Sequence, residues 1–113
     1  MTNILEERQR NRWLLLHKIY EVTQEISDAS SVNVYRVGER LGWEREKTED
    51  TFEYLQGEGL INGVTVGGGI KLTHQGIREV EQAKEYPHKP TLHFSMLDFT
   101  GIEDLATCLD TKC

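Results

Sequence analysis

Three consecutive glycines, at positions 67–69, separate two short segments rich in β-branched and aliphatic residues. Residues 60–66 and 70–73 are predicted to pair as a hairpin, because glycine adopts positive φ without a steric penalty and closes tight turns. The triplet does not match a phosphate-binding loop, since the lysine and hydroxyl residue that such a loop requires are absent. The rest of the chain has mostly helical periodicity, so the predicted fold class is α+β and mainly helical.

Four helices are predicted, at residues 3–28, 32–43, 44–57 and 77–84. In the first, Leu15, Ile19 and Val22 recur at i, i+4 and i+7 and define an apolar face. Asn3 and Glu6 stand at capping-box spacing at its start. This first helix is longer than a compact bundle of this size requires.

A tight turn separates the second and third predicted helices. Gly42 ends the second helix at a position that favours a left-handed residue, and Gly59 ends the third. The inward positions of the third helix are expected to be Thr48, Thr51 or Phe52, and Leu55. Short helix, tight turn and longer helix form the order of a helix-turn-helix unit.

The length of 113 residues suits one domain with a short appendage. We divide the chain into a domain of residues 1–86 and a C-terminal extension of residues 87–113. No apolar run approaches the roughly 20 residues that span a bilayer. The two cysteines, Cys108 and Cys113, both lie in the last six positions and cannot cross-link the body of the fold. We therefore expect a cytoplasmic protein without membrane contact.

The formal net charge is −6, so bulk attraction to nucleic acid is excluded and any such binding needs a local basic patch. Residues 44–60 hold six acidic and two basic residues, a net charge of −4. Most of the excess acid therefore falls on the third predicted helix.

Three stretches of sequence add to the order of the elements: VGERLGW at 37–43, YLQGEGLI at 54–61 and LTHQG at 72–76. Over residues 10–84 the chain resembles the winged helix-turn-helix transcription regulators of the MarR and PadR kind from bacteria and archaea. The resemblance implies three helices, a β-hairpin wing and a fourth helix, followed here by the C-terminal extension. In DNA-binding members of that group the third helix enters the major groove and the wing contacts phosphates.

The outward face of the third helix departs from that pattern. Its expected outward residues are Glu46, Lys47, Glu49, Asp50, Glu53 and Tyr54. Four of these six are acidic, and carboxylates pressed among phosphates would lose hydration and meet like charge. We therefore expect a non-catalytic winged-helix regulatory protein that acts at least partly as a protein-interaction or dimerisation module through this face, with Tyr54 as an anchor.

Sequence-specific DNA binding is the alternative. It would use a basic edge formed by Arg36, Arg40, Arg45, Lys47 and Lys71. A second basic cluster on the first helix comprises Arg8, Arg10 and Arg12. The competing interpretation is that these are ordinary solvated helix faces, because acidic neighbours such as Glu39 and Glu44 accompany them.

No catalytic or cofactor site is predicted, since no nucleophile stands in a recognisable relation to a base. The zinc-ligand types late in the chain are His88, His93, Cys108 and Cys113. Their spacing is unusual for zinc, so we interpret them as incidental surface residues. The aromatic residues Trp13, Tyr20, Tyr35, Trp43 and Phe52 are expected in the core and not in a stacking platform.

The C-terminal extension contains an amphipathic run with Ile102, Leu105 and Leu109 on one side. A helix of about 14 residues is marginal alone in water and needs a surface to pack on. We therefore predict a homodimer formed through the N-terminal helix and residues 91–109. Duplex DNA and another protein remain the other partners considered.

Overall fold

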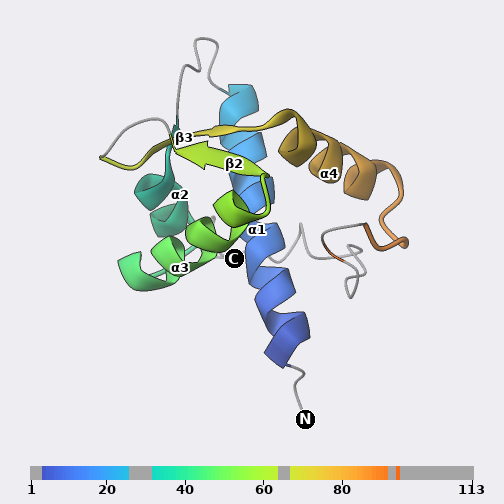
Figure 1. The fold of residues 1–113 in the computed structure, drawn as a ribbon, viewed down its shortest axis with the longest axis horizontal. Coiled ribbons are helices and arrows are strands. Elements are labelled where there is room, and N and C mark those ends of the chain that lie inside the picture. The colour runs from blue at the N-terminus through green and yellow to red at the C-terminus, as the bar shows by residue number, and fades with distance from the viewer. Residues whose placement is uncertain (1–3, 26–31, 64–66, 92–93, 95–113) are drawn as a thin grey trace.

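The computed structural model describes residues 4–25, 32–63, 67–91 and 94 (Figure 1). Within these ranges the chain forms four helices and a three-stranded antiparallel sheet. In chain order the elements are α1 (Ile4–Glu25), β1 (Val32–Asn33), α2 (Val34–Arg40), α3 (Arg45–Gly57), β2 (Ile61–Gly63), β3 (Gly69–Leu72) and α4 (His74–Glu85). The fold is therefore α+β and mainly helical, which confirms the predicted class.

The helix α1 lies at the centre of the fold, with α2 and α3 on one side and α4 on the other (Figure 1). Leu15 and Ile19 are fully buried on α1, as their spacing predicts. The aromatic residues predicted for the core lie in it or pack against it: Trp13, Tyr20, Tyr35, Trp43 and Phe52. The predicted cap at Asn3 lies outside the described residues. Among the helices that the structure describes, none has both the length and the apolar character to cross a membrane.

The strand β3 occupies the middle of the sheet, whose order is β1-β3-β2. β2 and β3 form the predicted hairpin, with Ile61 opposite Leu72. Gly68 at its tip has a φ of 102°, in the region that only glycine adopts freely. Gly67 and Gly68 therefore belong to the turn as predicted, whereas Gly69 is the first residue of β3 and pairs with Asn33.

Residues 32–33 form β1 and do not begin the second helix, which corrects the predicted start of that helix. The reason is a cap: the Asn33 side chain accepts hydrogen bonds from the backbone N–H groups of Tyr35 and Arg36. Asn33 itself keeps extended backbone angles, with φ −86° and ψ 117°. One residue therefore ends a strand and starts a helix.

Gly38 allows α2 and α3 to approach closely, because a Cβ at this position would overlap the Thr48 side chain. Gly42 in the turn has a φ of 77°, as expected for a left-handed residue after a short helix. Thr48, Thr51 and Leu55 are buried, which confirms the predicted inward face of α3. The opposite face of α3 is left to solvent.

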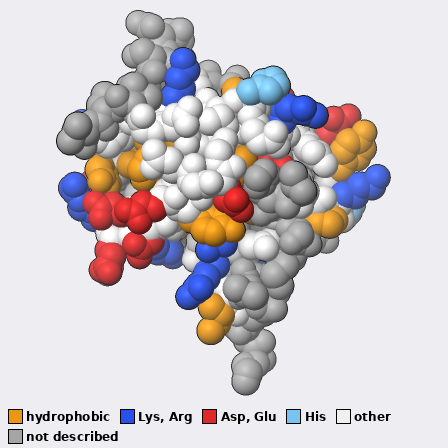
Figure 2. All heavy atoms as spheres, in the orientation of Figure 1, with side chains coloured by type: hydrophobic (Ala, Val, Ile, Leu, Met, Phe, Trp, Pro, Cys, Tyr) orange, Lys and Arg blue, Asp and Glu red, His pale blue; other side chains and the backbone are white. Residues whose placement is uncertain are grey.

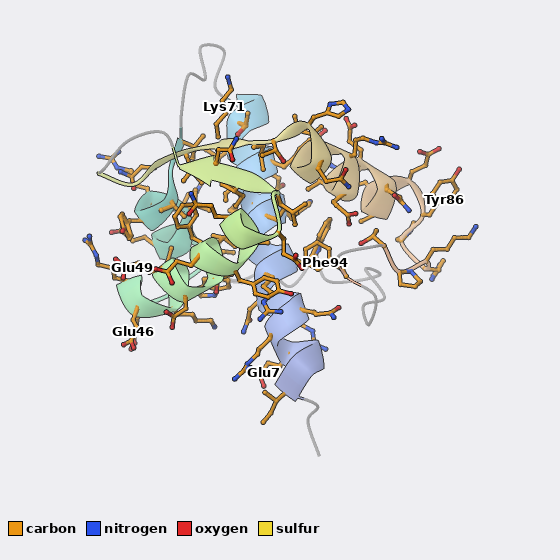
Figure 3. The ribbon with its side chains drawn as sticks, viewed as in Figure 1. Glu7, Glu46, Glu49, Lys71, Tyr86 and Phe94 are labelled. Atoms are coloured by element: carbon orange, nitrogen blue, oxygen red, sulfur yellow. The ribbon has the colours of Figure 1, made fainter. Side chains whose placement is uncertain are left out.

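The helix α4 begins at His74, earlier than the predicted residue 77. Its N-cap is Thr73, whose hydroxyl oxygen accepts a hydrogen bond of 3.0 Å from the Gly76 backbone N–H. After α4 the chain returns to α1, where Phe94 is 1% exposed and meets the Trp13 ring edge-on at a centroid distance of 5.6 Å (Figure 3). Phe94 is therefore part of the core.

Candidate functional site

The solvent face of α3 carries three exposed carboxylates, Glu46, Asp50 and Glu53, which we call the acidic stripe. Their spacing of i, i+4 and i+7 places them along one side of the helix, opposite the buried residues. Within the part of the chain that the structure describes, none of the three forms a hydrogen bond or ion pair. Figure 2 shows acidic side chains gathered in one patch over this region, and Figure 3 places Glu46 and Glu49 there.

Glu49 lies beside the stripe, and its carboxylate contacts two other side chains of the protein. It accepts a hydrogen bond of 2.9 Å from the Tyr35 hydroxyl and pairs with Arg45 Nε at 3.3 Å. The Arg45 guanidinium also covers the Tyr35 ring, 4.1 Å from its centre. Arg45 and Glu49, both predicted contact residues, therefore neutralise each other on the side of α3 that faces α2.

Lys47 and Tyr54 lie on the other flank of α3. The Lys47 ammonium is 4.5 Å from the centre of the Trp43 ring, and the Arg12 guanidinium is 3.3 Å from the centre of the Tyr54 ring. The Tyr54 hydroxyl donates a hydrogen bond of 3.0 Å to Glu58. Burial and this hydrogen bond raise the pKa of Tyr54, while the Arg12 charge opposes the rise.

An open groove with a volume of about 260 Å³ lies along the line where α1 and α3 meet. Its lining residues are Arg8, Asn11 and Arg12 from α1 and Asp50 and Thr51 from α3. The groove thus has one basic wall and one acidic residue facing it. In the described ranges Arg8 and Asp50 form no ion pair or hydrogen bond, so both charges are open to a ligand or partner.

The residues of the predicted basic edge lie on three different elements. Arg36 and Arg40 are exposed on α2, and Lys71 is exposed on β3. In Figure 3 Lys71 projects at the top of the view, apart from Glu46 and Glu49 at the left. The structure therefore does not place Lys71 next to the outward face of α3.

Of the zinc-ligand types, His88 is exposed in the turn after α4, whereas His93, Cys108 and Cys113 lie outside the described residues. Across residues 4–25, 32–63, 67–91 and 94 no three metal-ligating side chains come together. The predicted amphipathic run at residues 102–109 also lies outside the described residues.

Periodicity predicts the acidic stripe but not what surrounds it. Tyr35, expected only as a core residue, also orients Glu49, and the position of Arg8 and Arg12 across one groove from Asp50 was not expected. Comparison of the chain with protein-family models, curated proteins and solved structures gives no match. The functional argument therefore rests on the surface itself.

Proposed function

We propose that the chain is a non-catalytic regulatory protein of the winged helix-turn-helix type, and that its α3 face binds protein and not duplex DNA. The fold part of the proposal is supported by the order of elements, with α2 and α3 joined by a tight turn and followed by the β2–β3 hairpin and α4. The fold alone does not decide what such a surface binds.

The acidic stripe carries the functional part of the proposal. In a major groove Glu46, Asp50 and Glu53 would each lose hydration close to phosphates of the same charge. The two basic residues at the start of α3 do not compensate, because Arg45 is paired with Glu49 and Lys47 stacks on Trp43. Beside the stripe, Tyr54 offers a partly exposed aromatic ring, the residue type that anchors protein interfaces.

Duplex DNA binding through α2 and β3 is the second candidate, since Arg36, Arg40 and Lys71 are exposed. Fluorescence anisotropy with a labelled mixed-sequence duplex at about 50 mM salt separates the two functions, because non-specific attraction is strongest at low salt. We expect no binding. Binding with a salt slope of several phosphates, weakened by Lys47→Glu together with Lys71→Glu, would overturn the proposal.

A photo-reactive phenylalanine at position 53 provides the positive arm of the test, and the same group at position 85 on α4 is the matched control. Glu53 and Glu85 are both exposed helical glutamates, so the two variants differ only in the face that they probe. We expect a protein cross-link from position 53 and none from position 85. Equal cross-linking from both positions would show that proteins do not bind the α3 face in preference to the α4 face.

A further inference from the structure

Side chains of opposite charge line the two sides of the groove between α1 and α3, with a basic row on α1 and the acidic stripe on α3. On α1, Ile4, Arg8 and Arg12 follow at i, i+4 and i+8 and share one side of the helix. On α3 the acidic stripe runs past the same groove, in which Asp50 faces the two arginines. Among the residues that the structure describes, no ion pair or hydrogen bond satisfies Arg8 or the three carboxylates of the stripe.

The same face holds exposed apolar surface. In the described part of the chain three large hydrophobic residues are exposed, Ile4 at 64%, Tyr54 at 41% and Tyr86 at 48%. Ile4 continues the arginine row, and Tyr54 lies under Arg12. Both are therefore next to residues that line the groove, Tyr54 to Arg12 and Ile4 to Arg8 one turn later. The first turns of α1, which carry Ile4, extend past the other described elements (Figure 1).

A second copy of the chain has the chemistry that this face lacks. A two-fold axis between adjacent rows of opposite charge places the basic row of each copy on the acidic row of the other, so the surface is complementary to itself. The first turns of α1 would gain a packing surface that none of the other described elements provides.

We propose that two copies of this chain associate through the α1–α3 groove, with Arg8 of each copy paired to the acidic stripe of the other and with Ile4 and Tyr54 between them. The inference rests on the proposed function, because it names the partner of the α3 face. It shares α1 with the homodimer predicted from the sequence, but it uses α3 in place of residues 91–109. Formation of this dimer covers α3 and makes the face inaccessible to any other ligand.

Charge-reversed variants of the full chain test the proposal by sedimentation velocity at about 100 μM. The basic variant is Arg8→Glu, and the acidic variant combines Glu46→Lys with Glu53→Lys. Arg12 is left unchanged because its stack on Tyr54 is part of the fold. The matched controls are Arg78→Glu on α4, and Glu39→Lys with Glu85→Lys on α2 and α4, all at exposed positions. Circular dichroism confirms that every variant is folded.

We expect the wild type to dimerise at about 10 mM salt and to dissociate at about 1 M, where charges are screened beyond roughly 3 Å. Each variant alone should lose about tenfold or more in association constant, since every reversed charge occurs twice in the dimer. Their equimolar mixture should regain the dimer, because the reversed row of one then meets the reversed stripe of the other. The controls should behave as the wild type.

A wild type that stays monomeric at low salt overturns the dimer, and so does a dimer that neither variant weakens. If that monomer also fails to bind duplex DNA, the proposed function still stands. If it binds duplex DNA and Lys47→Glu weakens the binding, both proposals are wrong. A mixture of variants that remains monomeric shows that the two rows do not meet.

Discussion

The guanidinium of Arg12 on α1 lies 3.3 Å from the centre of the Tyr54 ring on α3, so a cation of one helix covers an aromatic face of the other. Together with the hydrogen bond from the Tyr54 hydroxyl to Glu58, this contact holds the ring in place while 41% of the residue stays exposed. A tyrosine fixed in this way loses little side-chain entropy on binding, which favours it as an interface anchor.

Tyr54 should titrate above its ordinary pKa of 10.0, because burial disfavours the phenolate and ionisation removes the proton shared with Glu58. A folded-state pKa above the unfolded value means that the stabilisation is complete below pH 10.0 and is lost as the pH rises through the folded pKa. The measurement is the tyrosinate absorbance of the wild type minus that of Tyr54→Phe. Glu58→Gln should lower the Tyr54 pKa, and a Tyr54 titration below pH 10.0 would contradict the account.

Gly38→Ala should lower the free energy of unfolding by about 1–3 kcal/mol, because its Cβ would overlap Thr48 where α2 and α3 meet. Gly57→Ala is the matched control on the same helix pair. No atom lies within 4 Å of a Cβ at Gly57, so this change should be neutral or stabilise by up to about 1 kcal/mol. Urea unfolding followed by circular dichroism gives both values, and equal effects would disprove the close approach.

Gly68→Ala should destabilise the tip of the β2–β3 hairpin. Its φ of 102° strains any L side chain, and a Cβ there would lie 2.6 Å from the Tyr35 ring. We expect a loss of about 1–3 kcal/mol in the free energy of unfolding, against a change within about 0.5 kcal/mol for Gly67→Ala, whose Cβ meets no atom.

Tyr35→Phe keeps the ring and removes only the hydrogen bond to Glu49, so it should lower the free energy of unfolding by about 0.5–1.5 kcal/mol.

Phe94→Ala should reduce the free energy of unfolding by about 3–5 kcal/mol, because it removes a fully buried ring from its contact with Trp13. Tyr86→Ala is the control in the same part of the chain, where a 48% exposed ring should matter by no more than about 0.5 kcal/mol. Thermal unfolding of both variants distinguishes a docked Phe94 from a loose one. A Phe94→Ala protein as stable as Tyr86→Ala would exclude docking.

Local sequence patterns predicted the parts of the fold that depend on local interactions. The spacing of Leu15 and Ile19, the inward face of α3 and the left-handed Gly42 all follow from helix periodicity and backbone sterics. The strand β1 was not predicted, because two residues give no periodicity and its hydrogen-bonding partner β3 is distant in the sequence. The helical spacing of Val34, Val37 and Leu41 does not define where α2 begins. The side-chain cap of Asn33 places its first residue at Val34.

In the candidate site, too, the sequence predicted the features that depend on local structure and not those that depend on tertiary packing. Periodicity predicted that Glu46, Asp50 and Glu53 share one face, since this needs only 3.6 residues per turn. The groove between Arg8 and Asp50 could not be predicted, because it depends on how α1 crosses α3. Contacts between distant segments are set by the packing of the whole core and leave no pattern in a single sequence.

Glu79 is a buried acid on α4 whose replacement should stabilise the protein. It is 1% exposed, and its Oε2 has no hydrogen-bond partner among the described residues. Glu79→Met keeps the length of the side chain and removes the cost of burying a polar group, so we expect a gain of about 1–3 kcal/mol in the free energy of unfolding. Glu85→Met, at an exposed position of the same helix, is the control and should change stability by less than about 0.5 kcal/mol. A loss of stability in Glu79→Met, measured by urea unfolding, would show that the carboxylate is needed where it lies.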